Sequence, residues 1–597
     1  MTTEIKARLT SLREKMKATD IHAYIIPSSD CHLSEYVPEC WKDREWISGF
    51  NGSAGTVIVT LDRAGLWTDS RYFLQGAEQL EGTTIELFKM GLPETPSIPQ
   101  FLRKEGGIKK VGFFGRAISV NEANSYKREL TVAGIEVVTD QDLIAEVRTS
   151  LPQIPMHPFF IQPLEYAGRS VQDKVADVRK ALDDAGANTM IITMLDEIAW
   201  LFNVRGTDVD YNPVGIAYGM ITRNEVRFYT FPEKITPEVK AHLEGSGVVI
   251  KPYAEIYNDV PALCEKSILV LDPARTNFAL ASAVPAHCTV ISQLSPITLL
   301  KACKNEAEYR GYQAAMKRDG VALTRFFIWL EKELDEGRTP DEVEIGEVLA
   351  SFRAKGDYYV SDSFATIAGY NGHGAIVHYR AEHPTAYKVE RKGMLLLDSG
   401  GQYNDGTTDI TRTISLDGNP TKRQKEDYTR VLMGHIDIAT AIYPQGTRGS
   451  QLDILARKAL WDNCQNYGHG TGHGVGHFLN VHEGPQNIRM DENPTTLRPG
   501  MVTSNEPGYY LANEYGIRIE NLVRTIPYNE TIDGTFYAFE TLTLCYLDNT
   551  LVEPSMMSAP QIKWYNDYQE RVYRELSPLL SAEEAAWLRN KTLPLTK

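Results

Sequence analysis

Carboxylates and histidines that could act together lie in the C-terminal half of this 597-residue chain. Eight of its thirteen histidines fall between residues 373 and 482. Residues 394–413 predict a hairpin-like pair of strands joined by a loop rich in Gly and Asn, with Asp398 on the first strand and Asp409 on the second. Two carboxylates held close together repel each other unless a cation lies between them. Turn-forming aspartates are the alternative for either residue alone.

A second cluster is built on alternating glycines. The stretch Tyr467–Pro485 reads YGHGTGHGVGHFLNVHEGP, with glycine at every second position of its first half. Alternate glycines fit an extended chain that another backbone or a ligand approaches closely. On such a chain His469, His473 and His477 are expected to point to one side. Four histidines in fourteen residues, counting His482, favour a metal or acid–base site over a structural role.

Two further strands are expected to carry glutamates. The first, MVTSNEP, ends at Glu506, because the following proline keeps that residue out of a helix. The second, Tyr515–Val523, alternates so that Arg518 and Glu520 share one face. An inward carboxylate beside an inward arginine is costly to bury without a charge partner. A solvent-facing strand with a salt bridge is the alternative.

Together these stretches supply four carboxylates and one imidazole, namely Asp398, Asp409, His473, Glu506 and Glu520. Such an oxygen-rich set favours Mn²⁺, with Co²⁺ or Zn²⁺ as alternatives, over a thiolate zinc site. Four negative charges suit two divalent cations better than one. Two metals about 3.5–4 Å apart can hold a hydroxide nucleophile and polarise a carbonyl.

These residues must be positioned by a multidomain chain, since its length predicts roughly two to four domains. Two proline-marked breaks divide it into 1–160, 161–300 and 301–597, the last with a helical extension from about residue 554. The first two segments alternate helix and strand, which predicts two related α/β domains. In the third, helices enclose short glycine-rich strands, which is typical of an α+β arrangement.

The predicted repeat also matches particular strands. After an opening helix, an apolar strand and an aromatic stretch, Thr56–Thr60 and Arg71–Phe73 correspond to Val214–Ile221 and Val226–Phe231. The repeat predicts that these pairs of segments form equivalent strands in the two domains.

Composition narrows the class of protein. Hydrophobic residues make up 42% and charged residues 23%, as in ordinary globular proteins. The formal charge of −16 argues against a nucleic-acid partner. Seven scattered cysteines without a Cys-x-x-Cys pair fit reduced thiols in a cytosol. There is no apolar signal segment, and no apolar run approaches the ~20 residues that span a bilayer. We therefore predict a cytoplasmic protein with no membrane partner.

The order and spacing of the five predicted ligands resemble those of the pita-bread metallopeptidases, which include methionine aminopeptidase, prolidase and aminopeptidase P. The stretches GTGHGVGHFLNVHEGP, SNEPGYY, YGIRIEN, SGFNGSAGTVIVT and LWTDSRYF resemble the cytosolic, three-domain form of aminopeptidase P. This resemblance covers nearly the whole chain. It implies two creatinase-like N-terminal domains, a pita-bread catalytic domain, and a homodimer. The implied reaction removes the N-terminal residue from peptides with proline in the second position.

The resemblance also implies a role for each predicted ligand. Asp398 would bind one metal ion, and Asp409 and Glu520 would bridge both. His473 and Glu506 would complete the coordination of the other ion. Glu506 would in addition handle the proton of the bridging hydroxide.

Further residues match positions around the metals in that family. His378 and His482 would assist the scissile carbonyl and the tetrahedral intermediate. His469 would lie beside the substrate pocket, and Arg518 near the bridging carboxylate. His477 stands where family members often carry a small residue, so we interpret it as a packing or hydrogen-bonding residue and not as a ligand.

Two alternatives remain at this point. A prolidase has the same metals but acts on Xaa-Pro dipeptides, and two α/β segments before the catalytic one favour aminopeptidase P instead. A non-catalytic pita-bread module that binds peptides belongs to a different class, and the presence of all five ligand positions argues against it.

Overall fold

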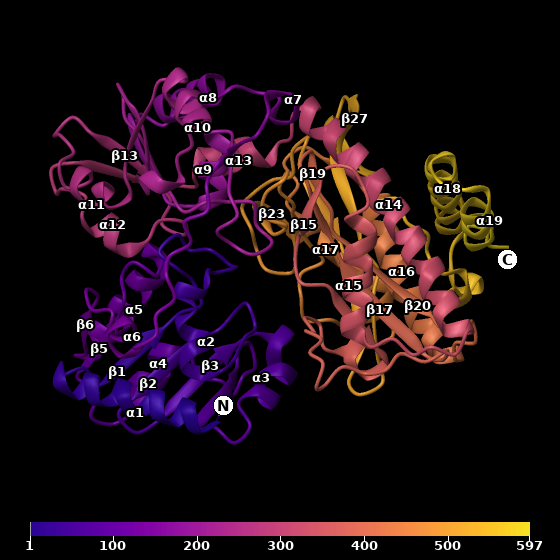
Figure 1. Cartoon of the computed structure of the whole chain (residues 1–597), viewed down its shortest axis with the longest axis horizontal. Helices are drawn as coiled ribbons and strands as arrows, with labels where there is room; N and C mark the ends of the chain where they lie inside the picture. The colour runs from indigo at the N-terminus through magenta and orange to yellow at the C-terminus, as the bar shows by residue number, and fades with distance from the viewer. Residues whose placement is uncertain (1, 597) are drawn as a thin grey trace. The chain divides into compact units, whose positions relative to one another are not determined.

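A computed structural model describes residues 2–596, which form two compact units (Figure 1). The first unit runs to Leu164 and includes Arg169–Thr298. The second comprises Glu165–Gly168 and the chain from Leu299 onward.

Two six-stranded sheets organise the first unit. One has the order β4-β3-β2-β1-β5-β6, and the other has the order β12-β11-β10-β8-β13-β14. In the first sheet β3, β2 and β1 pair antiparallel, and β4, β5 and β6 extend the sheet on either side by parallel pairing. In the second sheet β11, β10 and β8 pair antiparallel, and β12, β13 and β14 extend it in the same way. This identical topology confirms the prediction of two related α/β domains. The strands are β1 (Ala23–Ile26), β2 (Thr56–Thr60), β3 (Ala64–Thr68), β4 (Ile85–Lys89), β5 (Lys110–Phe113), β6 (Glu136–Val138), β8 (Thr189–Ile192), β10 (Tyr218–Ile221), β11 (Val226–Thr230), β12 (Val248–Pro252), β13 (Ile268–Leu271) and β14 (Thr289–Ser292).

One strand of the predicted repeat was wrong. The counterpart of β11 is β3, whereas Arg71–Phe73 lies in a 3₁₀ turn, η2 (Ser70–Tyr72), and at the start of a helix. The reason is local, because the carboxylate of Asp69 accepts a hydrogen bond from the backbone N–H of Arg71 and pairs with its guanidinium at 2.8 Å. An aspartate in this position begins a helical turn and ends a strand.

Helices cover both sheets of this unit, and the opening helix of each domain buries one apolar face. The helix α1 (Thr2–Ala18) buries Ile5, Leu9, Leu12 and Met16, and α8 (Val171–Asp184) buries Val171, Val175, Val178 and Leu182. This spacing places one side of each helix on its sheet. The other helices are α2 (Asp43–Ser48), α3 (Phe73–Gln79), α4 (Ile98–Lys104), α5 (Val120–Val132), α6 (Leu143–Val147), α9 (Leu195–Leu201), α10 (Pro237–Gly245), α11 (Ile256–Asp259) and α12 (Phe278–Ser282). Two short helices, α7 (Leu164–Ala167) and α13 (Pro296–Ala302), and the antiparallel pair β7 (Phe160–Ile161) and β9 (Val204–Arg205) complete the elements up to residue 302.

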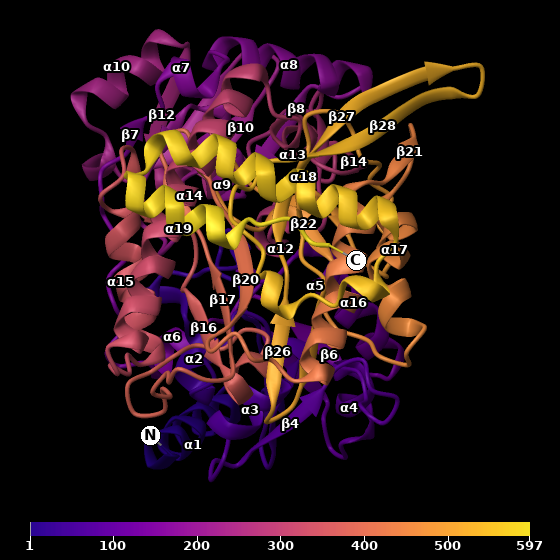
Figure 2. The same cartoon turned by 90° about the vertical axis from the view of Figure 1, so that its right-hand side faces the viewer.

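The second unit is built on antiparallel strands, as expected for the α+β pita-bread fold. A three-stranded sheet has the order β16-β17-β20, and a six-stranded sheet has the order β21-β28-β27-β24-β22-β23, with β27 and β28 forming a long hairpin (Figure 2). The strands are β15 (Tyr359–Asp362), β16 (Ile367–Tyr370), β17 (Met394–Ser399), β18 (Gly401–Tyr403), β19 (Gly406–Thr407), β20 (Ile410–Ser415), β21 (Ile442–Pro444), β22 (Gly472–Gly474), β23 (Glu483–Ile488), β24 (Val502–Asn505), β25 (Gly508–Leu511), β26 (Tyr515–Arg518), β27 (Asn521–Thr531) and β28 (Gly534–Thr541).

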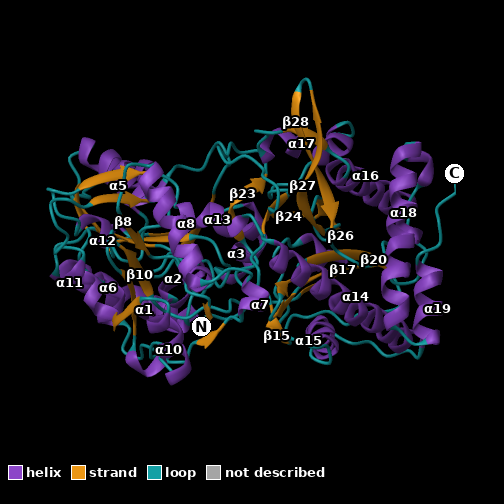
Figure 3. Ribbon diagram, turned by 90° about the horizontal axis from the view of Figure 1, so that it is seen from above, coloured by secondary structure: helices purple, strands orange, loops and turns teal. Residues whose placement is uncertain are grey.

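Helices pack against these sheets through shared core clusters. They are α14 (Glu306–Asp335), α15 (Glu342–Arg353), α16 (Lys422–Ala439), α17 (Gly449–Trp461), α18 (Ala559–Leu576) and α19 (Ala582–Lys591). The predicted C-terminal extension corresponds to the adjacent helices α18 and α19 (Figure 3). One core cluster joins Phe326 of α14, Leu395 of β17, Leu432 of α16 and Tyr565 of α18, so the extension is part of the fold that supports the sheet.

The sequence predicts reduced cysteines and no segment that spans a membrane. All seven cysteines are free thiols. Within residues 2–596, no helix combines the length and the apolar character needed to cross a membrane.

Candidate metal centre

Asp398 and Asp409 lie at the ends of two neighbouring strands. Asp398 is in β17, where it pairs across the sheet with Thr411 of β20. Asp409 immediately precedes β20 and is not part of that strand. The connection between β17 and β20 is not a simple loop but contains the short strands β18 and β19. The chain passes so closely at Gly400 that a Cβ there would lie 2.0 Å from the carbonyl oxygen of Thr408. This contact brings both carboxylates to one edge of the sheet.

His473 and Glu506 come from adjacent strands of the larger sheet and share a serine. His473 is in β22, and Glu506 directly follows β24. The Ser504 hydroxyl accepts a hydrogen bond from the His473 N–H at 2.9 Å and donates one to Glu506 Oε1 at 3.1 Å. The backbone N–H of Glu506 donates to the Thr471 carbonyl oxygen at 2.7 Å. These bonds hold the imidazole and the carboxylate side by side.

Glu520 reaches the site because its strand is interrupted. Residues 515–523 are not one continuous strand, since β26 ends at Arg518 and β27 begins at Asn521. In the gap, the Glu520 N–H donates to the Thr411 carbonyl oxygen at 3.1 Å, and the Thr411 hydroxyl donates to Glu520 Oε2 at 2.9 Å. Arg518 and Glu520 are each 1% exposed, so the alternative of a solvent-facing strand is wrong.

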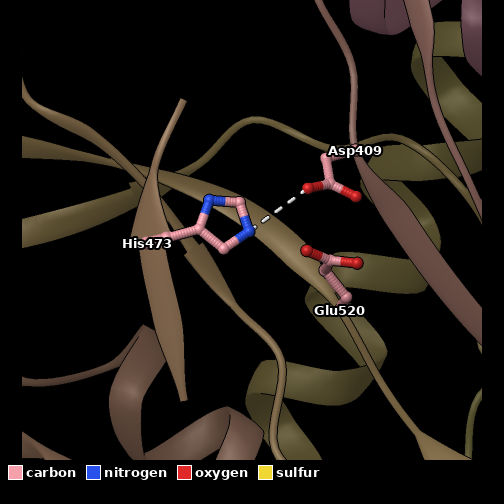
Figure 4. A group of neighbouring side chains, drawn as sticks. All are labelled: Asp409, His473 and Glu520. Carbon is pink, nitrogen blue, oxygen red and sulfur yellow. Dashed lines mark ion pairs between the residues drawn. The ribbon is translucent and has the colours of Figure 1, made fainter. Parts of the chain in front are cut away.

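The ligand atoms of Asp409, His473 and Glu520 all lie within 4.8 Å of one another (Figure 4). His473 Nε2 is 3.5 Å from Asp409 Oδ2 and 3.4 Å from Glu506 Oε1. Asp398 is tied to the same group through Arg518, whose Nη2 donates to Asp398 Oδ2 at 2.6 Å. The structure thus brings together all five residues that the sequence singled out as ligands.

The donor set fits divalent cations. Asp398 Oδ1 and Glu520 Oε1 are buried and have no hydrogen-bond partner among the described residues, which is rare for buried acceptors. Burial raises the pKa of Asp409 and of Glu520 well above their ordinary values, and the neighbouring carboxylates raise both further. Burial also raises the pKa of Glu506 to about 7. Cations placed among these oxygens would remove both the repulsion and the unsatisfied acceptors.

The remaining histidines of the glycine-rich stretch do not all face the same way. The His482 ring lies 4.5 Å from that of His473, centroid to centroid. His477 is 2% exposed and packs edge-on against Tyr312 of α14, with ring centroids 5.5 Å apart. The expectation that it shares a side with its neighbours is wrong because β22 ends at Gly474. Its position agrees with a packing role.

His469 and Arg518 are joined by a tyrosine that the sequence reasoning missed. The Tyr510 hydroxyl lies 2.7 Å from His469 Nε2 and accepts a hydrogen bond from Arg518 Nη1 at 2.8 Å. Burial raises the pKa of this phenol to about 12, so it stays protonated near neutral pH. The motif SNEPGYY contains Tyr510, but nothing in its sequence distinguishes Tyr510 from Tyr509.

His378 lies in the segment that follows the 3₁₀ helix η5 (Asn371–Ala375) and is partly buried. The carbonyl oxygen of the preceding residue, Val377, accepts a hydrogen bond from Arg518 Nη2 at 3.4 Å. The backbone at His378 is therefore attached to the arginine that also holds Asp398.

Family models match nearly the whole chain. Residues 310–526 match metallopeptidase family M24, and residues 535–595 match the C-terminal region of that peptidase. Residues 8–150 and 150–308 each match a creatinase/prolidase N-terminal domain. The pita-bread expectation and the creatinase-like expectation are both confirmed.

Two relatives are similar to this chain over nearly its whole length. A probable Xaa-Pro aminopeptidase P of Coprinopsis cinerea is 39% identical and covers 100% of this chain and 99% of its own length. Aminopeptidase P2 of Arabidopsis thaliana is 39% identical over 99% of this chain and 89% of its own length.

Solved structures give a matching result. The crystal structure of X-prolyl aminopeptidase from Caenorhabditis elegans, described as a cytosolic enzyme with a di-nuclear active site, has a TM-score of 0.94 and 33% identity, covering 99% of this chain and 100% of its own. A Bacillus anthracis Xaa-Pro dipeptidase shares the fold at a TM-score of 0.50 and 23% identity, covering 64% of this chain and 99% of its own.

Proposed function

This chain belongs to metallopeptidase family M24, and from that premise we propose that it is an Xaa-Pro aminopeptidase of the aminopeptidase P type. It hydrolyses the N-terminal bond of peptides whose second residue is proline. The observation that carries the proposal is the convergence of four carboxylates and one imidazole in a chain that matches Xaa-Pro aminopeptidases over its full length.

Two divalent metal ions would be held by Asp398, Asp409, His473, Glu506 and Glu520, and when bound they would supply a hydroxide nucleophile and polarise the scissile carbonyl. We propose Mn²⁺ as the metal because the ligands are predominantly oxygen. Glu506, whose Oε1 lies 3.4 Å from His473 Nε2 among the proposed ligands, is suited to take a proton from the nucleophile and return it to the leaving amine.

His378 and His482 are assigned to the reacting carbonyl. An imidazole that donates a hydrogen bond to the developing oxyanion stabilises the transition state more than the ground state. The contact of the His482 ring with His473, a proposed ligand, supports a place beside the scissile bond. Arg518 holds Asp398 in position through its 2.6 Å hydrogen bond.

Proline must be recognised by shape, since its nitrogen carries no hydrogen and its φ is fixed near −65°. We assign one wall of the proline pocket to His469, which is supported by Tyr510 at 2.7 Å. The free N-terminal amine of the peptide would be required, because it would bind a metal or pair with Asp398.

Three further features belong to the proposal. The protein acts in the cytoplasm, and the similar Caenorhabditis elegans enzyme is described as cytosolic. It forms a homodimer, as its resemblance to aminopeptidase P implies. Its domains are 1–160, 161–300 and 301–597 with the extension from about 554. The change of family model at residue 150 and near residue 308, together with the change of tertiary unit at Thr298, supports this division.

A prolidase has less support, because the relatives that match the full length are named aminopeptidases P. The test is to strip the protein of metal, refill it with Mn²⁺, and compare four substrates. We expect rapid cleavage of Xaa-Pro-Xaa, little cleavage of Xaa-Ala-Xaa or of an Xaa-Pro dipeptide, and none of N-acetylated Xaa-Pro-Xaa. Equal cleavage of the alanine peptide would refute proline specificity, preference for the dipeptide would indicate a prolidase, and no cleavage at all would favour a peptide-binding module.

A further inference from the structure

We propose that Glu342 is a positioning residue for His378, acting through the segment 371–387 that carries this histidine. The inference rests on the proposed function, in which His378 contacts the reacting carbonyl. It concerns how the chain holds that imidazole in place.

Glu342 is a buried carboxylate with an unusual number of partners. It is 1% exposed and is the first residue of α15. Its two oxygens accept hydrogen bonds from His373 Nδ1, the Tyr379 hydroxyl and the backbone N–H groups of Tyr370 and Tyr387, each at 2.8 Å. Four donors satisfy both oxygens of this buried carboxylate. Three of the four come from the segment that carries His378.

Aromatic contacts also join the residues that donate hydrogen bonds to Glu342. The His373 ring is stacked on Tyr387, with centroids 3.5 Å apart and an interplanar angle of 13°. The Tyr379 ring lies 4.4 Å from the His373 ring. The beginning and the end of the segment therefore meet at Glu342, which closes it into a loop.

The opposite side of the loop is attached to the metal centre. Arg518 Nη2 donates to the Val377 carbonyl oxygen at 3.4 Å and to Asp398 Oδ2 at 2.6 Å. The start of the loop also lies directly on β26, since a Cβ at Gly516 would be 1.7 Å from the Gly374 carbonyl oxygen. Only glycine allows this approach.

His378 thus stands between two fixed neighbours. Val377 before it is bound to the arginine of the metal centre, and Tyr379 after it is bound to Glu342. Residues 376–393 contain no helix and no extended strand, so this loop has little regular structure of its own to hold the imidazole. Because a displacement of about 1 Å at a reacting group can cost on the order of 10² in rate, Glu342 is expected to affect turnover without touching substrate.

The first part of the test uses single substitutions. Glu342→Gln removes one of two acceptor oxygens, and Tyr379→Phe removes one hydroxyl while it preserves the ring. We expect kcat to fall roughly 10- to 100-fold in Glu342→Gln and several-fold in Tyr379→Phe, with KM and the content of two metals unchanged. Tyr379→Phe tests the link even where loss of a buried acceptor lowers the yield of folded Glu342→Gln.

A matched control is available in the same unit. The Tyr309 hydroxyl donates to both oxygens of Glu540, at 2.7 and 2.9 Å, outside the loop of His378. Tyr309→Phe therefore removes a tyrosine–glutamate bond at a partly buried place, and we expect wild-type kcat. Equal losses of kcat in Tyr309→Phe and Tyr379→Phe would overturn the inference, because they would indicate a general effect on stability.

The second part is a double-substitution cycle. If Glu342 acts through His378, then Glu342→Gln combined with His378→Ala should be no slower than His378→Ala alone. If the double variant loses the product of the two single factors, Glu342 acts by another route and the inference fails while the proposed function stands. If His378→Ala alone keeps wild-type kcat, the assigned role of His378 and this inference are both overturned.

Discussion

Each of the two units buries charged side chains, but they balance those charges differently. In the first unit the side chains of Asp208 and Lys234 are fully buried and form an ion pair with each other. In the second unit the carboxylates of Asp398, Asp409 and Glu520 are buried, with Glu506 partly buried beside them. The guanidinium of Arg518 and the imidazole of His473 face these acids, and the His482 ring lies beside that of His473.

The Asp208–Lys234 pair balances its own charges and is structural, whereas the four acids of the second unit need cations to balance theirs. A buried pair loses about 3–5 kcal/mol when one partner is removed, because the other charge is left alone. A group of carboxylates gains stability in the absence of metal when one of them is neutralised, since like charges then repel less. The same change, from acid to amide, should therefore have opposite consequences in the two units.

The largest effect is expected from neutralising a bridging carboxylate. Asp409→Asn or Glu520→Gln should abolish peptide hydrolysis and lower the content of both metals, because each acid is proposed to bind both ions. The metal-free variants should unfold at the same temperature as the metal-free wild type or at a higher one. Elemental analysis, turnover and thermal unfolding measure these three quantities. Full activity with unchanged metal content would refute the assignment of the ligands.

A smaller loss is expected from the two histidines beside the metals. His378→Ala and His482→Ala should each lower kcat on the order of 10²–10³-fold, which is typical for one donor to a developing oxyanion. Both variants should keep two metals per chain. Steady-state kinetics with elemental analysis tests this, and loss of metal in either variant would instead make that histidine a ligand.

In the first unit, Asp208→Asn should destabilise the fold without affecting the chemistry. It leaves the buried ammonium of Lys234 without its partner and should cost about 3–5 kcal/mol of unfolding free energy. Metal content and kcat should not change at temperatures where the variant is folded. The exposed neighbour Asp210 provides the control, since Asp210→Asn should change stability by less than about 0.5 kcal/mol. A loss of metal in Asp208→Asn would contradict the comparison.

The smallest effect concerns pH. The pKa of Glu506 is raised by burial to about 7, and an unfolded glutamate titrates near 4.3. A raised pKa contributes stability below the unfolded value, and this contribution is lost as pH rises through the folded value. Metal-free protein should therefore become less stable between about pH 4 and pH 7. With saturating Mn²⁺ the trend should reverse, because metal ligands must be deprotonated. Melting curves at several pH values, with and without Mn²⁺, measure both trends.

The pH effect also distinguishes the two units. Asp208→Asn should leave the metal-free trend in place, since its site is in the first unit. Glu506→Gln should make the trend shallower without abolishing it, because the raised pKa values of Asp409 and Glu520 remain. A melting temperature of the metal-free wild type that rises over the same range would show that the acids of the second unit are not held protonated.

The types of the five proposed ligand residues and their order along the chain were predictable from local sequence, because each lies in a short pattern. Local sequence also predicted that two α/β domains precede the catalytic one, since alternation of helix and strand is read from nearby residues. The misplacement of one strand at Arg71–Phe73 had a local cause as well, the capping carboxylate of Asp69.

Which atoms meet depends on contacts between distant segments, which local patterns do not specify. Glu520 joins the site through Thr411, 109 positions away, at a break between β26 and β27 that the alternating pattern conceals. His477 turns to α14 instead of the metals, and Tyr510 and Glu342 acquire their contacts from segments distant in the chain. Periodicity specifies which face of an element a side chain occupies, but contacts between elements depend on how strands end and helices pack, and those depend on the whole core.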